Sequence, residues 1–160
     1  MKLFKFLAII LSGGIFMTAC SSDDDSSGKD QEKPEINIAY EQGFPKPCIE
    51  LVKGQTYTFR AMVTDNDALA AYSLDIHHNF DHHTHDDQDG DCALEELKQP
   101  ENPWIFMENY AIEDGGTNYE ITIELTVPQD VDTGDYHCSY SVTDQTGWQS
   151  RTAVDIKIIE

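Results

Sequence analysis

The chain has 160 residues, a formal net charge of −20 and 39% hydrophobic residues. This strong negative charge argues against nucleic acid and anionic lipid headgroups as partners, and it favours cations. The length is sufficient for one domain with a proper hydrophobic core, and the sequence shows no internal repeat.

The first 20 residues have the pattern of a bacterial lipoprotein signal. Lys2 and Lys5 form a basic start, a short apolar stretch follows, and Met17-Thr18-Ala19-Cys20 resembles a lipobox. The apolar stretch is too short for a transmembrane helix, and a long polar run follows it. We therefore expect a signal peptide over residues 1–19 and lipidation of Cys20, where several acyl chains give a stable membrane anchor.

Residues 20–34 predict a flexible acidic tether, because they are rich in Ser, Asp and Lys. Ser21-Ser22-Asp23-Asp24-Asp25 directly follows Cys20 and resembles the surface-export signal of some Gram-negative lipoproteins. We therefore expect an outer-membrane lipoprotein that is exposed on the cell surface, with the periplasmic face as the alternative.

From residue 35 onward, short runs with apolar residues at every second position alternate with turn residues. The predicted strands are 35–40, 56–64, 71–78, 104–110, 119–127, 135–143 and 149–159. A short helical turn at 93–98 is the one competing element. Seven short strands are typical of an all-β, Ig-like antiparallel β-sandwich, which we expect over residues 35–160.

The segment Asp132-Thr133-Gly134-Asp135-Tyr136-His137-Cys138 resembles the tyrosine corner of Ig-like domains, where a Tyr precedes a Cys by two residues. The second predicted strand has Met62 and lacks the Cys that usually pairs with this one. The resemblance therefore implies that Cys138 is a buried free thiol. Because lipid occupies Cys20, we expect the disulfide to join Cys48 and Cys92.

Almost the whole mature domain, from about residue 34 to 158, resembles a family of small bacterial outer-membrane Ig-like lipoproteins of unknown function. Three segments carry this resemblance. They are Phe44-Pro45-Lys46-Pro47-Cys48, Asp75-Ile76-His77-His78-Asn79-Phe80-Asp81-His82-His83-Thr84-His85, and Asp132-Thr133-Gly134-Asp135-Tyr136-His137. The resemblance implies a fold and a location, and it implies no activity.

Five of the six histidines lie within nine residues, and acidic residues surround them. Imidazole suits zinc, copper and nickel, and carboxylates complete such sites. The alternation predicts that Asp75 and His77 share the outer face of one strand, and that His137 points outward from the neighbouring strand, with Cβ atoms about 5 Å apart. The loop that follows is expected to fold back and add ligands. The predicted metal ligands are His77, His82, His83, His85, His137 and Asp75, with zinc or copper as the ion, while His78 is a candidate for the core.

Three alternatives accompany this hypothesis. In the first alternative, the histidines are solvated loop residues or a pH sensor, since imidazoles titrate near neutrality. Calcium at Asp65-Asn66-Asp67 and Asp144 is a weaker candidate, because such residues also stabilise turns. A surface adhesion module for protein or glycan is the third, with Trp104, Phe106 and Trp148 as its candidate aromatic patch.

Catalysis has little support in the sequence. There is no nucleophile elbow, and no catalytic triad signature or HExxH metalloprotease motif is present. We therefore expect a binding module and not an enzyme.

Overall fold

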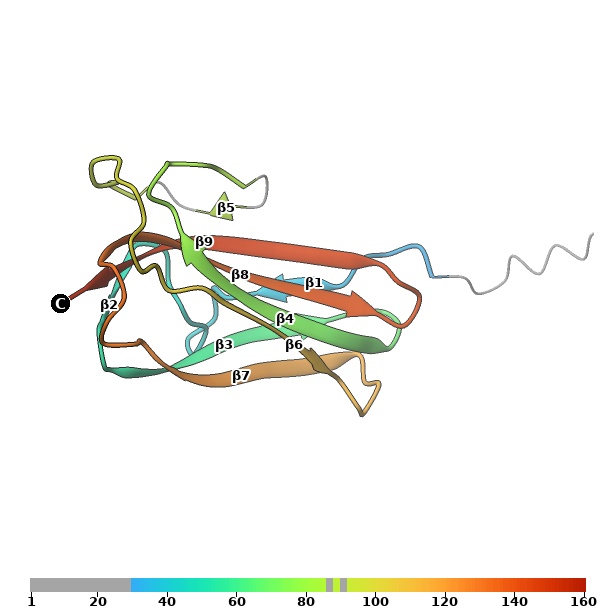
Figure 1. Cartoon of the computed structure of the whole chain (residues 1–160). Helices are drawn as coiled ribbons and strands as arrows, with labels where there is room; N and C mark the ends of the chain where they lie inside the picture. Colours follow the sequence, from blue (N-terminus) through green and yellow to red (C-terminus); the bar gives the residue numbers. More distant parts are fainter. Residues whose placement is uncertain (1–29, 86–87, 90–91) are drawn as a thin grey trace, which may run out of the picture.

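The computed structural model describes residues 30–85, 88–89 and 92–160. The predicted signal peptide, Cys20 and most of the predicted tether lie outside the described residues. Figure 1 shows two stacked β-sheets, and the described residues contain no helix. They accordingly include no helical segment with the length and apolar character needed to cross a bilayer. The expected all-β sandwich is confirmed.

The smaller sheet has three antiparallel strands. These are β1 (Glu35–Asn37), β3 (Thr56–Thr64) and β7 (Asn118–Thr126), in the order β1-β3-β7. The bounds of β3 agree with the predicted strand, because apolar residues occupy every second position from Tyr57 to Val63.

The larger sheet has the order β2-β9-β8-β4-β6. Its strands are β2 (Ile49–Val52), β4 (Leu69–His78), β6 (Phe106–Ala111), β8 (Gly134–Asp144) and β9 (Gln149–Ile159), and a two-residue strand, β5 (Gln88–Asp89), also pairs with β9. The pairs among β4, β6, β8 and β9 are antiparallel, whereas β2 and β5 run parallel to β9 along successive stretches of it. These two short parallel strands were not among the predicted seven. The helical turn expected at 93–98 is wrong, since these residues form no regular secondary structure.

The core lies between the two sheets and follows the predicted alternation. The inward residues of β4 and β8 are buried, and they face the buried residues of β3 and β7. The buried side chains of these four strands include Phe59, Ala61, Val63, Tyr72, Leu74, Ile76, Ile121, Ile123, Tyr136, Cys138, Tyr140 and Val142. Each buried aliphatic or aromatic side chain of this size contributes about 1.5–3 kcal/mol through removal from water.

The tyrosine corner is present. The hydroxyl of Tyr136 donates a hydrogen bond to the carbonyl of Asp132 at 2.7 Å, and it accepts one from the backbone N–H of Trp104 at 3.2 Å. Cys138 is a buried free cysteine, and Cys48 and Cys92 form a disulfide with Cα atoms 5.4 Å apart. Both expectations for these cysteines are confirmed.

The chain after β4 folds back over the outer face of the larger sheet. We call residues 79–85 the histidine loop. Its first residue donates a backbone hydrogen bond from Asn79 to the carbonyl of Asp135 at 2.8 Å. Beyond the loop, β5 pairs with β9, and Cys92 is held by the disulfide. The histidine loop is therefore fastened to the sheet through Asn79 at its start and, beyond its end, through β5 and the disulfide.

Candidate metal centre

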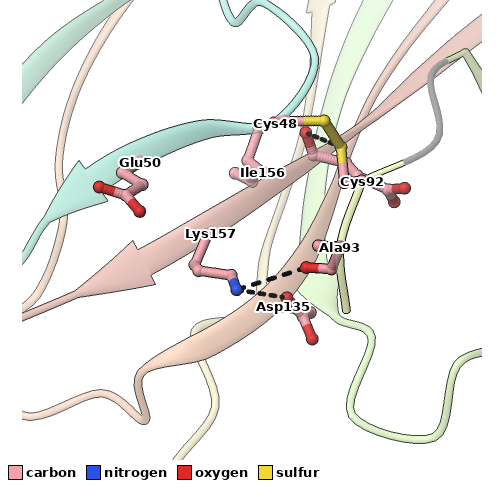
Figure 2. Close-up of a pocket in the computed structure, with 8 residues that line it drawn as sticks. Cys48, Glu50, Cys92, Ala93, Asp135, Ile156 and Lys157 are labelled. Atoms are coloured by element: carbon pink, nitrogen blue, oxygen red, sulfur yellow. Dashed lines mark hydrogen bonds and ion pairs between the residues drawn. A yellow bond between two sulfur atoms is a disulfide. The ribbon is translucent and has the colours of Figure 1, made fainter. Parts of the chain in front are cut away.

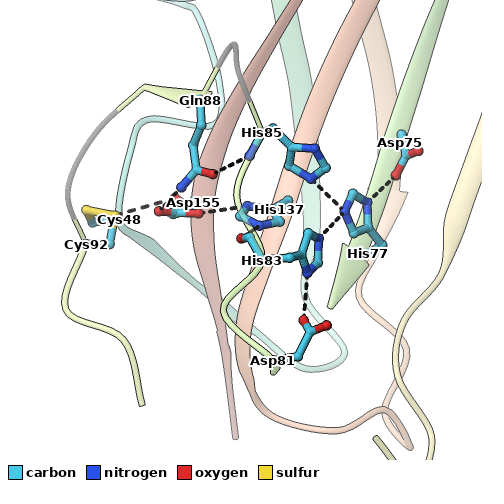
Figure 3. A network of polar contacts seen from close by, with 10 residues as sticks. All are labelled: Cys48, Asp75, His77, Asp81, His83, His85, Gln88, Cys92, His137 and Asp155. Carbon is cyan, nitrogen blue, oxygen red and sulfur yellow. Dashed lines mark hydrogen bonds and ion pairs between the residues drawn. A yellow bond between two sulfur atoms is a disulfide. The ribbon is translucent and has the colours of Figure 1, made fainter. Parts of the chain in front are cut away.

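Three imidazoles converge above the outer face of the larger sheet (Figure 3). His77 comes from the end of β4, and His83 and His85 come from the histidine loop. The Nε2 atom of His77 lies 3.2 Å from that of His83 and 3.1 Å from that of His85. One ligand nitrogen from each residue lies within 4.8 Å of the others. These are three of the six predicted ligands.

Two carboxylates contact the Nδ1 atoms of two of these imidazoles and so orient the rings. The alternation of β4 places Asp75 on the same face as His77, and its Oδ1 atom lies 2.6 Å from Nδ1 of His77. The Oδ1 atom of Asp81 lies 2.7 Å from Nδ1 of His83. An ionised carboxylate only accepts hydrogen bonds, so each Nδ1 donates to its carboxylate, and in a neutral imidazole the Nε2 atom then presents a lone pair. Asp75 therefore contacts an imidazole of the cluster, and the structure does not place it among the converging ligand atoms.

The convergence of lone pairs fits a metal ion. Nε2 lone pairs of His77 and His83 that face each other at 3.2 Å repel, unless a proton or a cation lies between them. In a tetrahedral zinc site with Zn–N bonds of 2.0–2.1 Å, two ligand nitrogens are about 3.3 Å apart. The observed separations are close to that value. A carboxylate at the far nitrogen of a ligand histidine is the usual arrangement in zinc proteins.

Burial keeps His85 in the form that binds metals. Desolvation is the largest cause that lowers the pKa of His85 from its ordinary value, and any protonation of His77 or His83 lowers it further. The imidazole of His85 is therefore neutral at neutral pH, and a neutral ring nitrogen is the one that ligates a metal ion.

His137 lies beside the cluster on the outer face of the larger sheet, as predicted. It pairs directly with His77 across β4 and β8, and the two ring centroids are 5.4 Å apart, so the predicted neighbourhood is confirmed. However, the histidine loop covers its side chain, which is fully buried. Its Nε2 donates to the carbonyl of His83 at 3.1 Å. His137 therefore supports the loop from below and does not join the three converging imidazoles.

A buried carboxylate on β9, not predicted as a site residue, completes this support. Oδ1 of Asp155 lies 2.8 Å from Nδ1 of His137, close enough for an ion pair although the two atoms are not aligned for a hydrogen bond. Oδ2 of Asp155 accepts a hydrogen bond from Gln88 of β5 at 2.7 Å. Burial lowers the pKa of His137. The alternation in β9 could have identified Asp155 as a residue of this face, because it stands between the inward Val154 and Ile156 and so points outward.

The other two histidines lie outside the cluster. His82 has a φ of 57°, in the left-handed region, and its Nε2 is buried without a hydrogen-bond partner. The structure does not bring this predicted ligand together with His77, His83 and His85. His78 stacks on the ring of Phe80, with centroids 4.9 Å apart, but it is only half-buried and does not belong to the core, so its candidate core position is wrong.

Figure 2 shows a pocket beneath the disulfide, at the edge of the same face. Lys157 fills the polar side of this pocket, with its Nζ 3.5 Å from Oδ1 of Asp135 and 3.4 Å from Oε1 of Glu95. Burial alone lowers the pKa of Lys157, but the two carboxylates outweigh this effect and raise it above its ordinary value. These contacts attach the chain that follows Cys92 to β8 and β9.

At the opposite end of the sandwich, Asp65 and Asp144 lie together, as the calcium alternative required. Asp30 joins them, and one carboxylate oxygen from each lies within 4.8 Å of the others. Asp67 does not join, since its Oδ1 accepts the backbone N–H of Ala68 at 2.8 Å.

Comparisons with known proteins provide a family and no activity. No curated protein matches the chain. The sporulation control protein Spo0M from Bacillus subtilis has a similar structure, with a TM-score of 0.39 and 8% identity, over 80% of this chain and 49% of that one. The chain thus spans about half the length of that structure.

One family matches nearly the whole chain, over residues 18–159. Its description agrees with the expectation of a family without an assigned activity. The chain belongs to the family of the domain of unknown function DUF4625.

Proposed function

We propose that this protein is a lipid-anchored extracytoplasmic module that binds a transition-metal ion, zinc or copper, through His77, His83 and His85. The observation that carries the proposal is the convergence of three Nε2 atoms, two of them on imidazoles whose Nδ1 faces a carboxylate. The proposed role is binding and not catalysis, because the two neighbouring carboxylates, Asp75 and Asp81, are already engaged with the imidazoles.

Export to an oxidising compartment is part of the same proposal. The lipobox ending at Cys20 and the acidic stretch after it support a membrane-anchored position, with the cell surface preferred to the periplasmic face. The disulfide between Cys48 and Cys92 supports an oxidising environment, where such bonds persist.

The burial of the aromatic candidates makes the adhesion alternative weaker. It relied on a patch formed by Trp104, Phe106 and Trp148. Trp104 is 7% exposed and belongs to the core, and Phe106 packs against that core. Trp148, at 39% exposure, remains as the exposed member. A protein or glycan partner therefore has less support than a metal ion.

Calorimetric titration of the metal-free chain, without a histidine tag, tests the proposal. Zn²⁺ and Cu²⁺ are added in separate experiments, and one ion per chain is expected to bind. His83→Asn removes one Nε2 ligand and should weaken binding by at least about 100-fold, since a structural metal site depends on each ligand.

His82→Asn is the matched control, because His82 is the next residue in the chain and lies outside the cluster. It should change the affinity by less than about threefold. If neither ion binds in a saturable way, or if both variants lose affinity equally, the proposed site is wrong.

A further inference from the structure

The described chain begins at the end of the sandwich opposite the histidine loop (Figure 1). A second cluster of ligand-type side chains lies at this end. Asp65 follows the end of β3, Asp144 is the last residue of β8, and Asp30 is the first described residue. One carboxylate oxygen from each lies within 4.8 Å of the others. The cluster therefore brings together three segments that are far apart in the sequence.

Specific hydrogen bonds hold Asp30 in this cluster. The indole N–H of Trp148 donates to the backbone carbonyl of Asp30 at 3.1 Å, and the side-chain amide of Asn66 donates to its Oδ1 at 2.7 Å. These contacts attach the start of the domain to the β3–β4 turn and to the β8–β9 turn.

Each of the three carboxylates keeps one buried oxygen without a partner. Oδ1 of Asp144 accepts the backbone N–H groups of Gly147 and Trp148 at 2.6 and 2.9 Å, which stabilises the β8–β9 turn. Its other oxygen, Oδ2, has no hydrogen-bond partner, although Asp144 is only 2% exposed. Oδ2 of Asp30, a residue that is 8% exposed, and Oδ1 of Asp65 are in the same condition. Buried polar atoms are nearly always satisfied, so these oxygens require a ligand.

The missing partner of these carboxylate oxygens should carry a positive charge. Three carboxylates at this distance repel one another, and the ion pairs among the described residues include none to Asp30, Asp65 or Asp144. Burial, and to a smaller extent the charges of Asp144 and Asp30, raise the pKa of Asp65. A cation between the carboxylates removes both the repulsion and the unsatisfied oxygens.

We propose that Asp30, Asp65 and Asp144 form a calcium site that clasps the incoming chain to the end of the sandwich. The ligand atoms are all oxygens, which hard cations such as Ca²⁺ prefer and which zinc and copper prefer less. With Ca–O distances of 2.3–2.6 Å, two ligands on opposite sides of the ion are about 4.8 Å apart. Carboxylate oxygens within 4.8 Å of one another can therefore reach one ion.

The calcium site is separate from the metal centre. It adjoins the start of β4 at Leu69, and the metal centre uses His77 near the end of the same strand. Eight residues of strand correspond to about 26 Å. Oxygen ligands at one end and nitrogen ligands at the other give the two sites opposite metal preferences.

Terbium luminescence tests the calcium site directly. Tb³⁺ replaces Ca²⁺ at oxygen sites, and a nearby indole sensitises its emission. The full chain is stripped of metal and titrated with Tb³⁺ while tryptophan is excited. Because Trp148 contacts Asp30, bound Tb³⁺ should emit, and added Ca²⁺ should displace it. Asp65→Asn and Asp144→Asn should each weaken Ca²⁺ binding by at least about tenfold, since affinity depends on the number of charged ligands.

Three controls keep the result decisive. Asp67→Asn changes an exposed neighbour outside the cluster and should leave the affinity within about threefold. Trp148→Phe should reduce the emission and leave Ca²⁺ binding detectable by calorimetry. Absence of saturable Ca²⁺ binding, or unchanged affinity in a folded Asp65→Asn or Asp144→Asn variant, overturns the site. Emission that disappears in His83→Asn instead would assign the Tb³⁺ to the metal centre and also overturn it.

Discussion

Asp75 determines which nitrogen of His77 is free to bind a metal. Its carboxylate lies 2.6 Å from Nδ1 and holds the proton there, so that Nε2 points at the other two imidazoles with a lone pair. Asp75→Asn removes the charge and keeps the shape. We expect Zn²⁺ affinity to fall by about 10–100-fold, the usual effect of losing such an orienting group. Calorimetric titration of the metal-free variant measures this change.

Asp114→Asn is the control for the loss of one negative charge, because Asp114 is exposed in the turn between β6 and β7. Its Zn²⁺ affinity should equal that of the wild type. An equal loss in both variants would show that Asp75 acts only through the overall acidic field.

His137 makes the metal-free fold sensitive to acid. Burial lowers its pKa in the folded state from the ordinary value of 6.5. As the pH falls through 6.5, the unfolded chain takes up a proton at this residue before the folded chain does. The free energy of unfolding should therefore decrease with falling pH until the folded pKa is reached. Urea denaturation of metal-free protein between pH 7 and pH 5 measures this decrease.

His137→Gln isolates the contribution of this residue, since a Gln amide can still donate to the carbonyl of His83 and does not titrate. The loss of stability between pH 7 and pH 5 should be smaller in this variant. Identical slopes would mean that the folded and unfolded chains protonate His137 equally over this range, and that burial does not lower its pKa.

Alternation predicts which faces of the strands carry the histidines but not which ring nitrogens meet. Opposite positions on neighbouring strands placed His77 beside His137 correctly. For the loop, the sequence predicts all three of His82, His83 and His85 as ligands, and the structure brings only His83 and His85 to His77. A left-handed φ at His82 is a local backbone property that no periodicity reveals, and the structure leaves this residue out of the cluster. The burial of His137 also depended on the loop that covers it.

At the scale of elements, the disulfide fastens the histidine loop to the domain. Cys48 precedes β2, and its backbone N–H donates to the carbonyl of Asp155 at 2.8 Å. The side chain of this same Asp155 lies beside His137. Cys48→Ser/Cys92→Ser removes a link across a sequence separation of 44 residues. Chain entropy predicts a loss of about 4 kcal/mol in the free energy of unfolding. Zn²⁺ affinity should also fall, because His83 and His85 lose an attachment that limits their freedom.

Chemical denaturation and Zn²⁺ titration of the double variant check both effects. A reducing agent should bring the wild type to the level of the variant and leave the variant unchanged. Unaltered Zn²⁺ affinity in the variant would show that β5 and the backbone hydrogen bonds hold the loop without the disulfide.

The sequence predicted long strands better than short ones. The strands β3 and β9 were predicted at their observed bounds, because nine and eleven residues give enough alternation to identify a face. In contrast, β2 and β5 have four and two residues, and they exist because the edge of β9 provides parallel partners. That edge is a tertiary feature, and so these two strands have no local signal.

In the whole molecule, the proposed metal centre lies at the end of the sandwich opposite the one where the described chain begins. Lipidation at Cys20 should therefore anchor the protein without affecting the site. Cys20→Ser removes the acylated thiol, and we expect the variant to be absent from the membrane fraction and to carry no acyl label. Its Zn²⁺ affinity should equal that of the wild type. A variant that stays in the membrane fraction would mean that another segment provides the anchor.

The acidic stretch after Cys20 should act on location alone. Replacement of Asp23, Asp24 and Asp25 by Ala keeps the lipobox and removes the resemblance to a surface-export signal. We expect such a variant to remain in the outer membrane and to lose accessibility to protease added to intact cells. Equal protease accessibility of both proteins would show that the acidic residues serve as a solvated spacer and that the choice of membrane face is made elsewhere.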